Sequence, residues 1–252
     1  MESTLILALR SLLFYLGYAL SLILVSTSAL VGSLFLPRTA VVRLCVYWCQ
    51  FSLWWARIAC GIRYRVIGAE NIPEGGCVIL AKHQSAWETL FVQSQFYPAA
   101  TVVKRELMWV PFFGWALRFS DPIAINRAEP ASALKSLLRQ GDEKLKSGRH
   151  IVIFPEGTRT VPGASNTDYS VGGAMLACRS KAIVVPLAHN AGDCWPRGTL
   201  IKYPGLITVV IGKPIHAGDY SPKALNAEVR AWIEARMPEI STVYKTEQAA
   251  GR

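Results

Sequence analysis

The residues best suited to acid–base chemistry are His83 and Glu88, in the stretch CVILAKHQSAWETLF. The apolar run that ends before Lys82 predicts a buried strand, His83 falls in the following turn, and a helix is expected to begin near Ser85. On one continuous helix the two side chains would be about 140° apart, so they meet only if His83 lies before the helix and folds back over its first turn. A carboxylate on one imidazole nitrogen would leave the other free as a base near neutral pH.

The same residues also have a purely local interpretation. Ser85 and Glu88 match the S-x-x-E capping box, in which the carboxylate bonds the backbone at the start of a helix. Spacing alone leaves the dyad and the cap equally open, and His83 by itself is compatible with an ordinary loop histidine.

A second candidate is the stretch IVIFPEGTRT, where a buried strand runs into a tight turn. Gly157 allows a close approach of the backbone, while Thr158 and Arg159 offer a hydroxyl and a guanidinium that suit a phosphate. A tight loop with a surface salt bridge explains the same residues equally well.

Two further stretches place functional residue types at the ends of expected strands. VVKRELMWVPFFGWALRF and the following IAINR carry Lys104, Arg105 and Arg127 beside a loop rich in aromatic residues, which suits a ligand with an anionic head and a long apolar tail. Core aromatics and solvated cations are the alternative. In IVVPLAHN, Pro186 interrupts a buried run and indicates an edge strand or a bend.

The elements that must position these residues follow from the alternation of β-rich runs with helical patterns after Tyr64. This alternation predicts an α/β fold, a mixed and largely parallel sheet flanked by helices, in which ligands lie at the carboxyl ends of strands. The expected strands are 64–69, 77–81, 100–104, 122–126, 150–154, 182–188 and 208–212. The expected helices are 87–96, 131–146, 172–180 and 222–237.

The amino-terminal region is expected to meet lipid. Residues 11–37 carry no charge, and this run is longer than the roughly 20 residues needed to cross a bilayer; a cleaved signal peptide is the less favoured alternative. The aromatic-rich stretch 41–62 has a polar stripe of Arg43, Gln50 and Arg57, which suits an interfacial helix, with a buried core helix as the alternative. Hydropathy does not decide whether the first helix spans the bilayer or forms a hairpin within one leaflet.

We therefore divide the chain into a membrane-associated helical hairpin (1–62), an α/β domain (63–241) and a polar tail (242–252). The 252 residues are 52% hydrophobic and 17% charged, with a mean hydropathy of +0.28. The formal net charge of +10 favours anionic partners, and arginines around both apolar stretches fit an anionic cytoplasmic leaflet. Six scattered cysteines indicate reduced thiols and no metal site, and no nucleic-acid motif is present.

Taken in order, the four stretches resemble the PlsC-type 1-acyl-sn-glycerol-3-phosphate acyltransferases, over about residues 83–190. The first block of that family, a His and an acid separated by four residues, matches His83 and Glu88, with Glu where Asp is usual. The second block matches Lys104, Glu106, Leu107, Pro111 and Gly114, followed by Arg127. FPEGTR, residues 154–159, matches the third block, and Val185 and Pro186 match the fourth.

The resemblance implies a role for each matched residue. His83 would be the general base and Glu88 would orient it. The residues implied in binding the glycerol phosphate are Lys104, Arg127, Glu156, Gly157, Thr158 and Arg159. The residues implied near the acyl donor are Pro111, Gly114, Val185 and Pro186.

The resemblance also implies a reaction and a location. An acyl group would pass directly from acyl-CoA or acyl-carrier protein to the sn-2 hydroxyl of lysophosphatidic acid, giving phosphatidic acid without a metal or redox cofactor, at the cytoplasmic side of a bacterial inner membrane. Alternative acceptors are an ornithine lipid or another lysophospholipid. A non-catalytic basic membrane scaffold is the non-enzymatic alternative, and a hydrolase is disfavoured because no G-x-S-x-G elbow is present.

Overall fold

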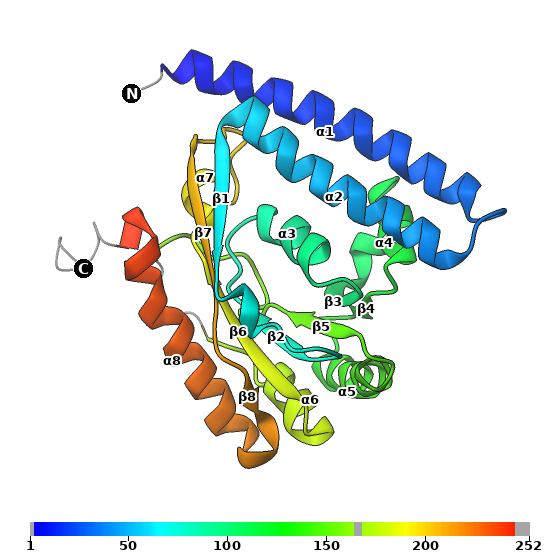
Figure 1. Ribbon diagram of the computed structural model, residues 1–252, viewed down its shortest axis with the longest axis vertical. Coiled ribbons are helices and arrows are strands. Elements are labelled where there is room, and N and C mark those ends of the chain that lie inside the picture. Colours follow the sequence, from blue (N-terminus) through cyan, green and yellow to red (C-terminus); the bar gives the residue numbers. More distant parts are fainter. Residues whose placement is uncertain (1–2, 164–167, 245–252) are drawn as a thin grey trace.

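The computed structural model describes residues 3–163 and 168–244, built around one eight-stranded sheet (Figure 1). The strand order is β1-β7-β6-β2-β5-β3-β4, with β8 beside β6. The strands are β1 (Ile62–Ile67), β2 (Val78–Ala81), β3 (Ala99–Lys104), β4 (Ile123–Ile125), β5 (His150–Ile153), β6 (Ile183–His189), β7 (Gly205–Ile211) and β8 (Ile215–His216). The predicted fold class, a mixed and largely parallel sheet flanked by helices, is confirmed.

The parallel part of the sheet contains β2, β3, β4, β5 and β6. Only β7 and β8 pair with β6 in the antiparallel sense, while β1 runs parallel to β7. The carboxyl ends of the five parallel strands therefore meet at one edge of the sheet, although the residues that follow them are far apart in the sequence.

Of the two alternatives that Pro186 indicated, the edge strand is wrong, because β6 lies in the interior of the sheet. Its neighbour on one side changes within the strand, from β8 at residues 183–184 to β7 at residues 187–189. Pro186 falls at this change, where its carbonyl accepts the backbone N–H of Gly212 at 2.9 Å. Pro186 is paired in register with neither β8 nor β7, so the ladder on that side does not require the N–H that proline lacks.

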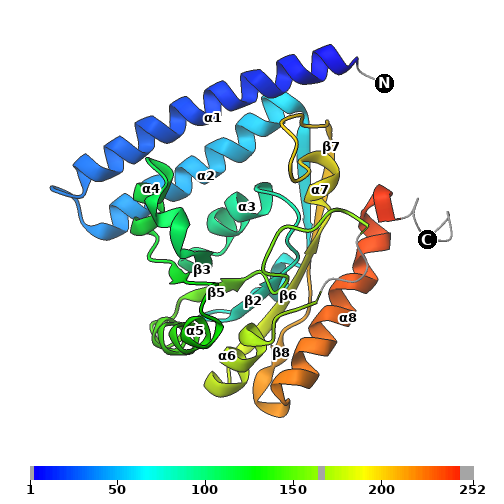
Figure 2. The same cartoon turned by 180° about the vertical axis from the view of Figure 1, so that it is seen from behind.

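Helices cover both faces of the sheet (Figures 1 and 2). On one face lie α1 (Thr4–Gly32), α2 (Arg38–Cys60) and α3 (Trp87–Gln95), and on the other lie α5 (Pro130–Lys146), α6 (Gly172–Ser180) and α8 (Pro222–Ile240). Successive residues of β2 supply both cores, because Ile79 packs with the first group and Leu80 with the second. The shorter helical elements are α4 (Phe113–Phe119), α7 (Ala191–Cys194) and the 3₁₀ turns 69–71, 105–109 and 217–219.

Helices α1 and α2 lie side by side along one end of the molecule (Figure 1). Gly17 permits their close approach, since a Cβ there would lie 2.3 Å from Nε1 of Trp55. The same indole nitrogen donates a hydrogen bond to the carbonyl of Phe14 at 3.1 Å. The two helices therefore form a packed pair rather than two independent segments.

Within the described residues, α1 is the helix that is long and apolar enough to cross a membrane. Its leucines are widely exposed, for example Leu5 and Leu24 at 69% and 68%. Helix α2 has features of both expected alternatives, the interfacial helix and the core helix. Trp48 is buried in the core, whereas Trp54 is exposed.

The segment expected as a polar tail begins with residues that pack on the domain. Tyr244 is buried, and the backbone N–H of Thr242 donates to Asp193 at 3.1 Å. The rest of that segment, 245–252, lies outside the described residues.

Candidate active site

The predicted site residues come together at the edge where the parallel strands end. His83 follows β2, the Gly157–Arg159 segment follows β5, Lys104 ends β3, and Arg127 follows β4. All of these line one cavity of about 460 Å³. This is the place where open α/β sheets bind their ligands.

His83 and Glu88 form a direct pair. His83 lies in the turn before α3 and folds back over its first turn, so that its Nδ1 is 2.8 Å from Oε1 of Glu88. A carboxylate accepts hydrogen bonds, so Nδ1 carries the proton and Nε2 is left as the basic nitrogen. The imidazole stacks on Phe154 with ring centroids 4.2 Å apart, which fixes its orientation at the cavity wall.

Glu88 is a fully buried carboxylate that also caps the helix. Its Oε1 accepts the backbone N–H groups of Gln84 and Ser85 at 2.9 and 2.8 Å. Burial by itself raises the pKa of Glu88, but the hydrogen bonds from the His83 imidazole and the Ser85 N–H help to lower it below the ordinary value. Glu88 is therefore held as an anion beside His83.

His189, at the end of β6, lies behind this pair. Its Nε2 donates to the carbonyl of Lys82 at 2.8 Å and its Nδ1 accepts the N–H of Ala191 at 3.2 Å, which is the pattern of a neutral imidazole. Burial lowers the pKa of His189 accordingly. Its Nε2 is 4.0 Å from Oε2 of Glu88, so it faces the second oxygen of the carboxylate.

Glu156 differs from the role that the resemblance implied, because its buried carboxylate does not line the cavity. Oε1 accepts the backbone N–H of His83 at 2.8 Å, and Oε2 lies 3.4 Å from Nζ of Lys82. Lys82 is itself buried and reaches Glu234 of α8 at 2.8 Å. The geometry assigns Glu156 to holding the turn of His83 rather than to a phosphate, which a carboxylate would repel.

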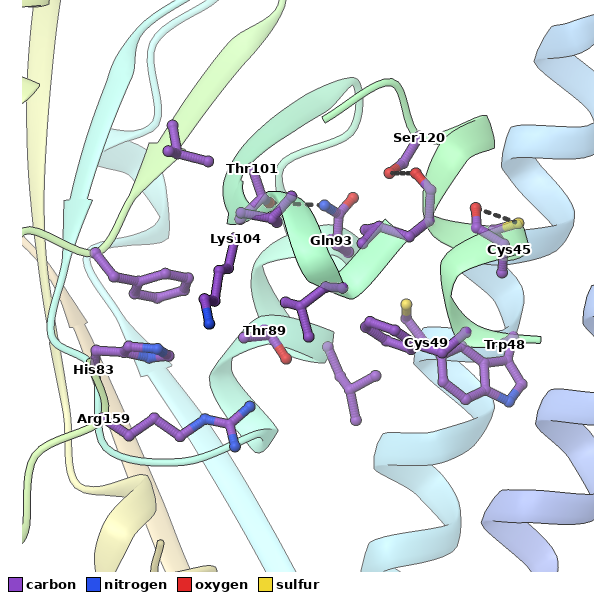
Figure 3. Close-up of a pocket in the computed structure, with 18 of the residues that line it drawn as sticks. Cys45, Trp48, Cys49, His83, Thr89, Gln93, Thr101, Lys104, Ser120 and Arg159 are labelled. Carbon is purple, nitrogen blue, oxygen red and sulfur yellow. Dashed lines mark hydrogen bonds between the residues drawn. The ribbon is translucent and has the colours of Figure 1, made fainter. Parts of the chain in front are cut away.

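The other residues implied in phosphate binding do line the cavity: Lys104, Arg127, Gly157, Thr158 and Arg159. Gly157 has a φ of 70°, a conformation that favours glycine. Arg127 donates to the carbonyl of Gly157 and so ties the ends of β4 and β5 together. Figure 3 shows the side chains of His83 and Arg159 pointing in the same direction into the cavity, with the amine of Lys104 close by.

The opposite end of the cavity is apolar and is formed largely by α2. Val42, Cys45 and Cys49 of this helix line it together with Leu90 of α3 and Leu117 of α4. Figure 3 shows Cys45 and Cys49 across the cavity from His83. The cavity thus joins a cationic end, which carries the histidine, to an apolar end.

The four residues implied near the acyl donor do not line the cavity. Pro111 and Gly114 lie in the segment whose neighbours Leu107 and Phe113 do so, and Gly114 allows a close approach to Met108, whose carbonyl would be 2.5 Å from an added Cβ. Val185 is buried in the core beneath α1–α3, and Pro186 lies within β6.

Sequence reasoning missed three residues of the site: Lys82, His189 and Arg197. Lys82 and His189 lie within stretches that the sequence analysis examined, but nothing in their spacing links them to Glu156 or Glu88. Arg197 lines the cavity from the loop between α7 and β7, which carries no recognised motif.

No group of three or more His, Cys, Asp and Glu side chains within residues 3–163 and 168–244 is arranged to hold a metal ion. The expectation that no metal or cofactor takes part stays a prediction. The six cysteines are free thiols.

The fold and site resemble known proteins in a consistent way. The sequence profile of the family described as "Acyltransferase" matches residues 63–190. The crystal structure of the 1-acyl-sn-glycerophosphate acyltransferase PlsC from Thermotoga maritima superimposes with a TM-score of 0.77, covering 92% of this chain and 94% of that one at 24% identity. The described architecture is therefore that of an α/β acyltransferase domain with an amino-terminal helix pair.

Two relatives extend the comparison to nearly the whole chain. A 1-acyl-sn-glycerol-3-phosphate acyltransferase of Pseudomonas aeruginosa is 48% identical over 240 residues, which are 94% of this chain and 93% of the relative. One from Chlamydomonas reinhardtii is 26% identical over 92% of this chain and 71% of the relative. This chain belongs to the acyltransferase family.

Proposed function

We propose that this protein transfers an acyl group from a thioester to the sn-2 hydroxyl of 1-acyl-sn-glycerol 3-phosphate and so makes phosphatidic acid. The observation that carries the proposal is the His83–Glu88 pair, 2.8 Å apart, in a cavity with a cationic and an apolar end. The Pseudomonas aeruginosa relative, 48% identical and named for this acceptor, supports the choice of lysolipid.

His83 is the proposed general base. Its Nε2 takes the proton of the sn-2 hydroxyl while that oxygen attacks the thioester carbonyl carbon. The tetrahedral intermediate then collapses, the carbon–sulfur bond breaks, and the proton on Nε2 passes to the departing thiolate. Glu88 keeps the Nδ1 proton in place and stabilises the imidazolium that forms between the two steps.

The cationic end of the cavity suits the acceptor's phosphate. Lys104, Arg127 and Arg159 line it, and a guanidinium presents paired N–H donors that match phosphate oxygens. A phosphate held there fixes the adjacent hydroxyl near His83, which lowers the entropic cost of the reaction.

The apolar end of the cavity suits an acyl chain. Residues of α2 and α3 form its wall, including Cys49 and Leu90. The proposed donor is acyl-CoA or acyl-carrier protein, and the basic chain, with a formal net charge of +10, is compatible with either anionic donor. The reaction as written is balanced without a metal or redox cofactor.

The proposed location is the cytoplasmic side of a bacterial inner membrane. Helix α1 exposes leucines along its length, and Leu34 and Phe35 in the turn after it are exposed at 76% and 81%. Trp109, 74% exposed, lies in the segment that leads into α4, which packs against α1. An anionic leaflet would meet this apolar surface and the arginines beside it.

The experiment is an acyl-transfer assay on the full chain dispersed in detergent. Parent, His83→Ala and His216→Ala are compared for thiol release and for phosphatidic acid detected by mass spectrometry, with lysophosphatidic acid and either acyl-CoA or acyl-carrier protein. His216 is exposed on β8 and outside the cavity, so it is the matched control. We expect the His83 variant alone to lose activity, by about 10²- to 10⁴-fold.

Each outcome of this assay discriminates between the proposed function and an alternative. Thiol release without acceptor would indicate a thioesterase, and product formation only with an ornithine-linked or other lysolipid would replace the proposed acceptor. Full activity of folded His83→Ala would refute the mechanism, and a folded parent inactive with every thioester and lysolipid would favour a non-catalytic scaffold.

A further inference from the structure

Arg197 is a cavity residue that lies outside every motif of the chain. It belongs to the loop between α7 and β7, its side chain is exposed, and it lines the same cavity as His83 and Arg159. The sequence alone gives no reason to select it from the chain's 27 Lys and Arg residues.

The loop that carries Arg197 is anchored on both sides. Before it, the Trp195 ring packs edge to face on Phe14 of α1, with centroids 4.9 Å apart. After it, buried Lys202 donates from its backbone N–H to Ser11 at 2.8 Å and from Nζ to the Tyr15 hydroxyl at 2.7 Å. Arg197 therefore extends from a fixed position rather than from a free loop.

Two arginines hold the Gly157–Arg159 segment from different elements. Arg127 donates to the carbonyl of Gly157, and Arg197 donates from Nη1 to the carbonyl of Arg159. Each bond uses one of the five N–H donors of a guanidinium, so most donors of Arg197 remain for a ligand. Both side chains thus hold the segment that carries Arg159 through its backbone carbonyls.

The charge of the cavity wall points to an anion. Its formally charged residues within the described chain are Lys104, Arg127, Arg159 and Arg197, and no Asp or Glu lines it. In the acceptor, the phosphate-bearing carbon is bonded to the carbon that carries the reacting hydroxyl. A hydroxyl at His83 therefore brings the phosphate to this cationic end.

We propose that Arg197 binds the phosphate of the acceptor lysolipid together with Arg159, an inference that rests on the proposed function. Its guanidinium, oriented by the Arg159 carbonyl, adds to the phosphate site a cation from the loop between α7 and β7. It is a specificity residue that separates 1-acyl-glycerol 3-phosphate from the phosphate-free 1-acylglycerol.

The test is equilibrium binding to the full chain in detergent, without a co-substrate. Parent, Arg197→Gln and Arg179→Gln are titrated separately with lysophosphatidic acid, 1-acylglycerol and CoA. Arg179 is an exposed arginine of α6 outside the cavity, so its variant loses the same charge elsewhere. We expect Arg197→Gln to raise the Kd of lysophosphatidic acid about 10- to 100-fold, and to change the other two by less than about threefold.

Four results would overturn the proposal. An unchanged Kd for lysophosphatidic acid would exclude a phosphate contact, an equal loss for 1-acylglycerol would make Arg197 a purely structural residue, and a loss for CoA alone would assign it to a phosphate of the donor. A parent chain that does not bind lysophosphatidic acid also overturns it.

Failure of the inference is distinguishable from failure of the proposed function. A parent that forms phosphatidic acid while Arg197→Gln binds lysophosphatidic acid normally refutes only the Arg197 role. A parent that binds lysophosphatidic acid through Arg197 but forms no phosphatidic acid refutes the function and keeps the site.

Discussion

Oε1 of Glu88 accepts the Nδ1–H of His83 at 2.8 Å while it also accepts the backbone N–H groups of Gln84 and Ser85, in the turn that leads into α3. The dyad and the helix cap, which the sequence presents as alternatives, are thus made by the same oxygen. The helix cap fixes the carboxylate, and the carboxylate fixes the imidazole.

Neutralising Glu88 should impair the reaction more than the fold. Glu88→Gln removes the charge that stabilises the imidazolium but keeps the size of the side chain, so we expect kcat to fall about 10²- to 10⁴-fold. Steady-state kinetics on protein of matched thermal stability measures this. Glu88→Asp keeps the charge and should retain more activity than Glu88→Gln; equal activity of Glu88→Gln and parent would remove Glu88 from the mechanism.

The buried Lys82 should be a major determinant of stability. Lys82→Met leaves Glu156 and Glu234 without their shared cation, and we expect it to lower the free energy of unfolding by about 3–5 kcal/mol. Denaturant unfolding of the variant in detergent measures the loss. Glu234→Gln should cost less, and the double variant less than the sum of the two single changes.

A control on α8, the helix that carries Glu234, separates the effect of Lys82→Met from that of losing a positive charge at any position. Arg236 pairs with Glu239 on the surface of α8, so Arg236→Gln should change stability by no more than about 0.5 kcal/mol. A Lys82→Met variant as stable as Arg236→Gln would show that the buried cluster contributes little.

Histidine burial predicts a loss of stability on mild acidification. Burial lowers the pKa of His189 and of His150, so between the ordinary value near 6.5 and the lower folded values the unfolded chain binds more protons. The contribution of these two buried histidines to the free energy of unfolding is therefore fully present above pH 6.5 and is lost as the pH decreases through this window. Thermal unfolding midpoints at pH 7.5 and 5.5 measure the decrease, and His189→Gln should reduce it.

The comparison uses the difference between the two pH values, so a variant with a lower midpoint at both remains informative. His216→Ala, on the exposed strand β8, should keep the pH dependence of the parent. A dependence identical in parent and His189→Gln would exclude His189 as a contributor.

The close contact between Gly17 and Trp55 predicts that the packing of α1 against α2 contributes to the stability of the protein. Gly17→Val would place side-chain atoms where the indole lies, since even a Cβ would be 2.3 Å from Nε1. We expect a loss of about 1–3 kcal/mol, measured by thermal unfolding. Gly32→Val is the control, because the nearest atom to its Cβ is a Leu36 methyl at 3.4 Å; equal effects at both positions would contradict close packing at Gly17.

The apolar end of the cavity predicts a chain-length effect. Cys49→Phe adds volume on the α2 wall and should lower kcat/KM for long-chain thioesters about 10-fold or more relative to short-chain ones. A series of acyl-CoA lengths measures the ratio. Cys178→Phe on α6, outside the cavity, should leave the ratio unchanged; an unchanged ratio in Cys49→Phe would place the acyl chain elsewhere.

Local patterns were sufficient to predict seven of the eight strands and the main helices, but not β8. The apolar runs that became β2 and β5 end two residues before His83 and directly before the FPEGTR turn, so strand ends and candidate residues lie close together in the sequence. The periodic runs 131–146 and 222–237 became α5 and α8 with shifts of three residues or fewer at either end.

What the sequence did not predict depends on contacts between distant segments. Pro186 indicated an edge because the switch from β8 to β7 beside it is visible only in the sheet order. Glu156 was placed with the phosphate-binding residues because its bonds to His83 and Lys82 span more than 70 positions. Arg197 carries no local signal, since its place at the cavity comes from a loop anchored on α1.

The wall that α2 contributes to the cavity can diverge among relatives independently of the reacting groups. The family profile covers residues 63–190 and includes every residue proposed to handle protons, whereas Val42, Cys45 and Cys49 lie before it. Substitutions in α2 are therefore expected to alter which acyl chains are accepted while the reacting groups stay the same. A chimera that exchanges residues 1–60 between two relatives would transfer the lipid composition of the product without transferring the chemistry, and a shortened domain without α1 and α2 would keep the reacting groups but lose one side of the cavity.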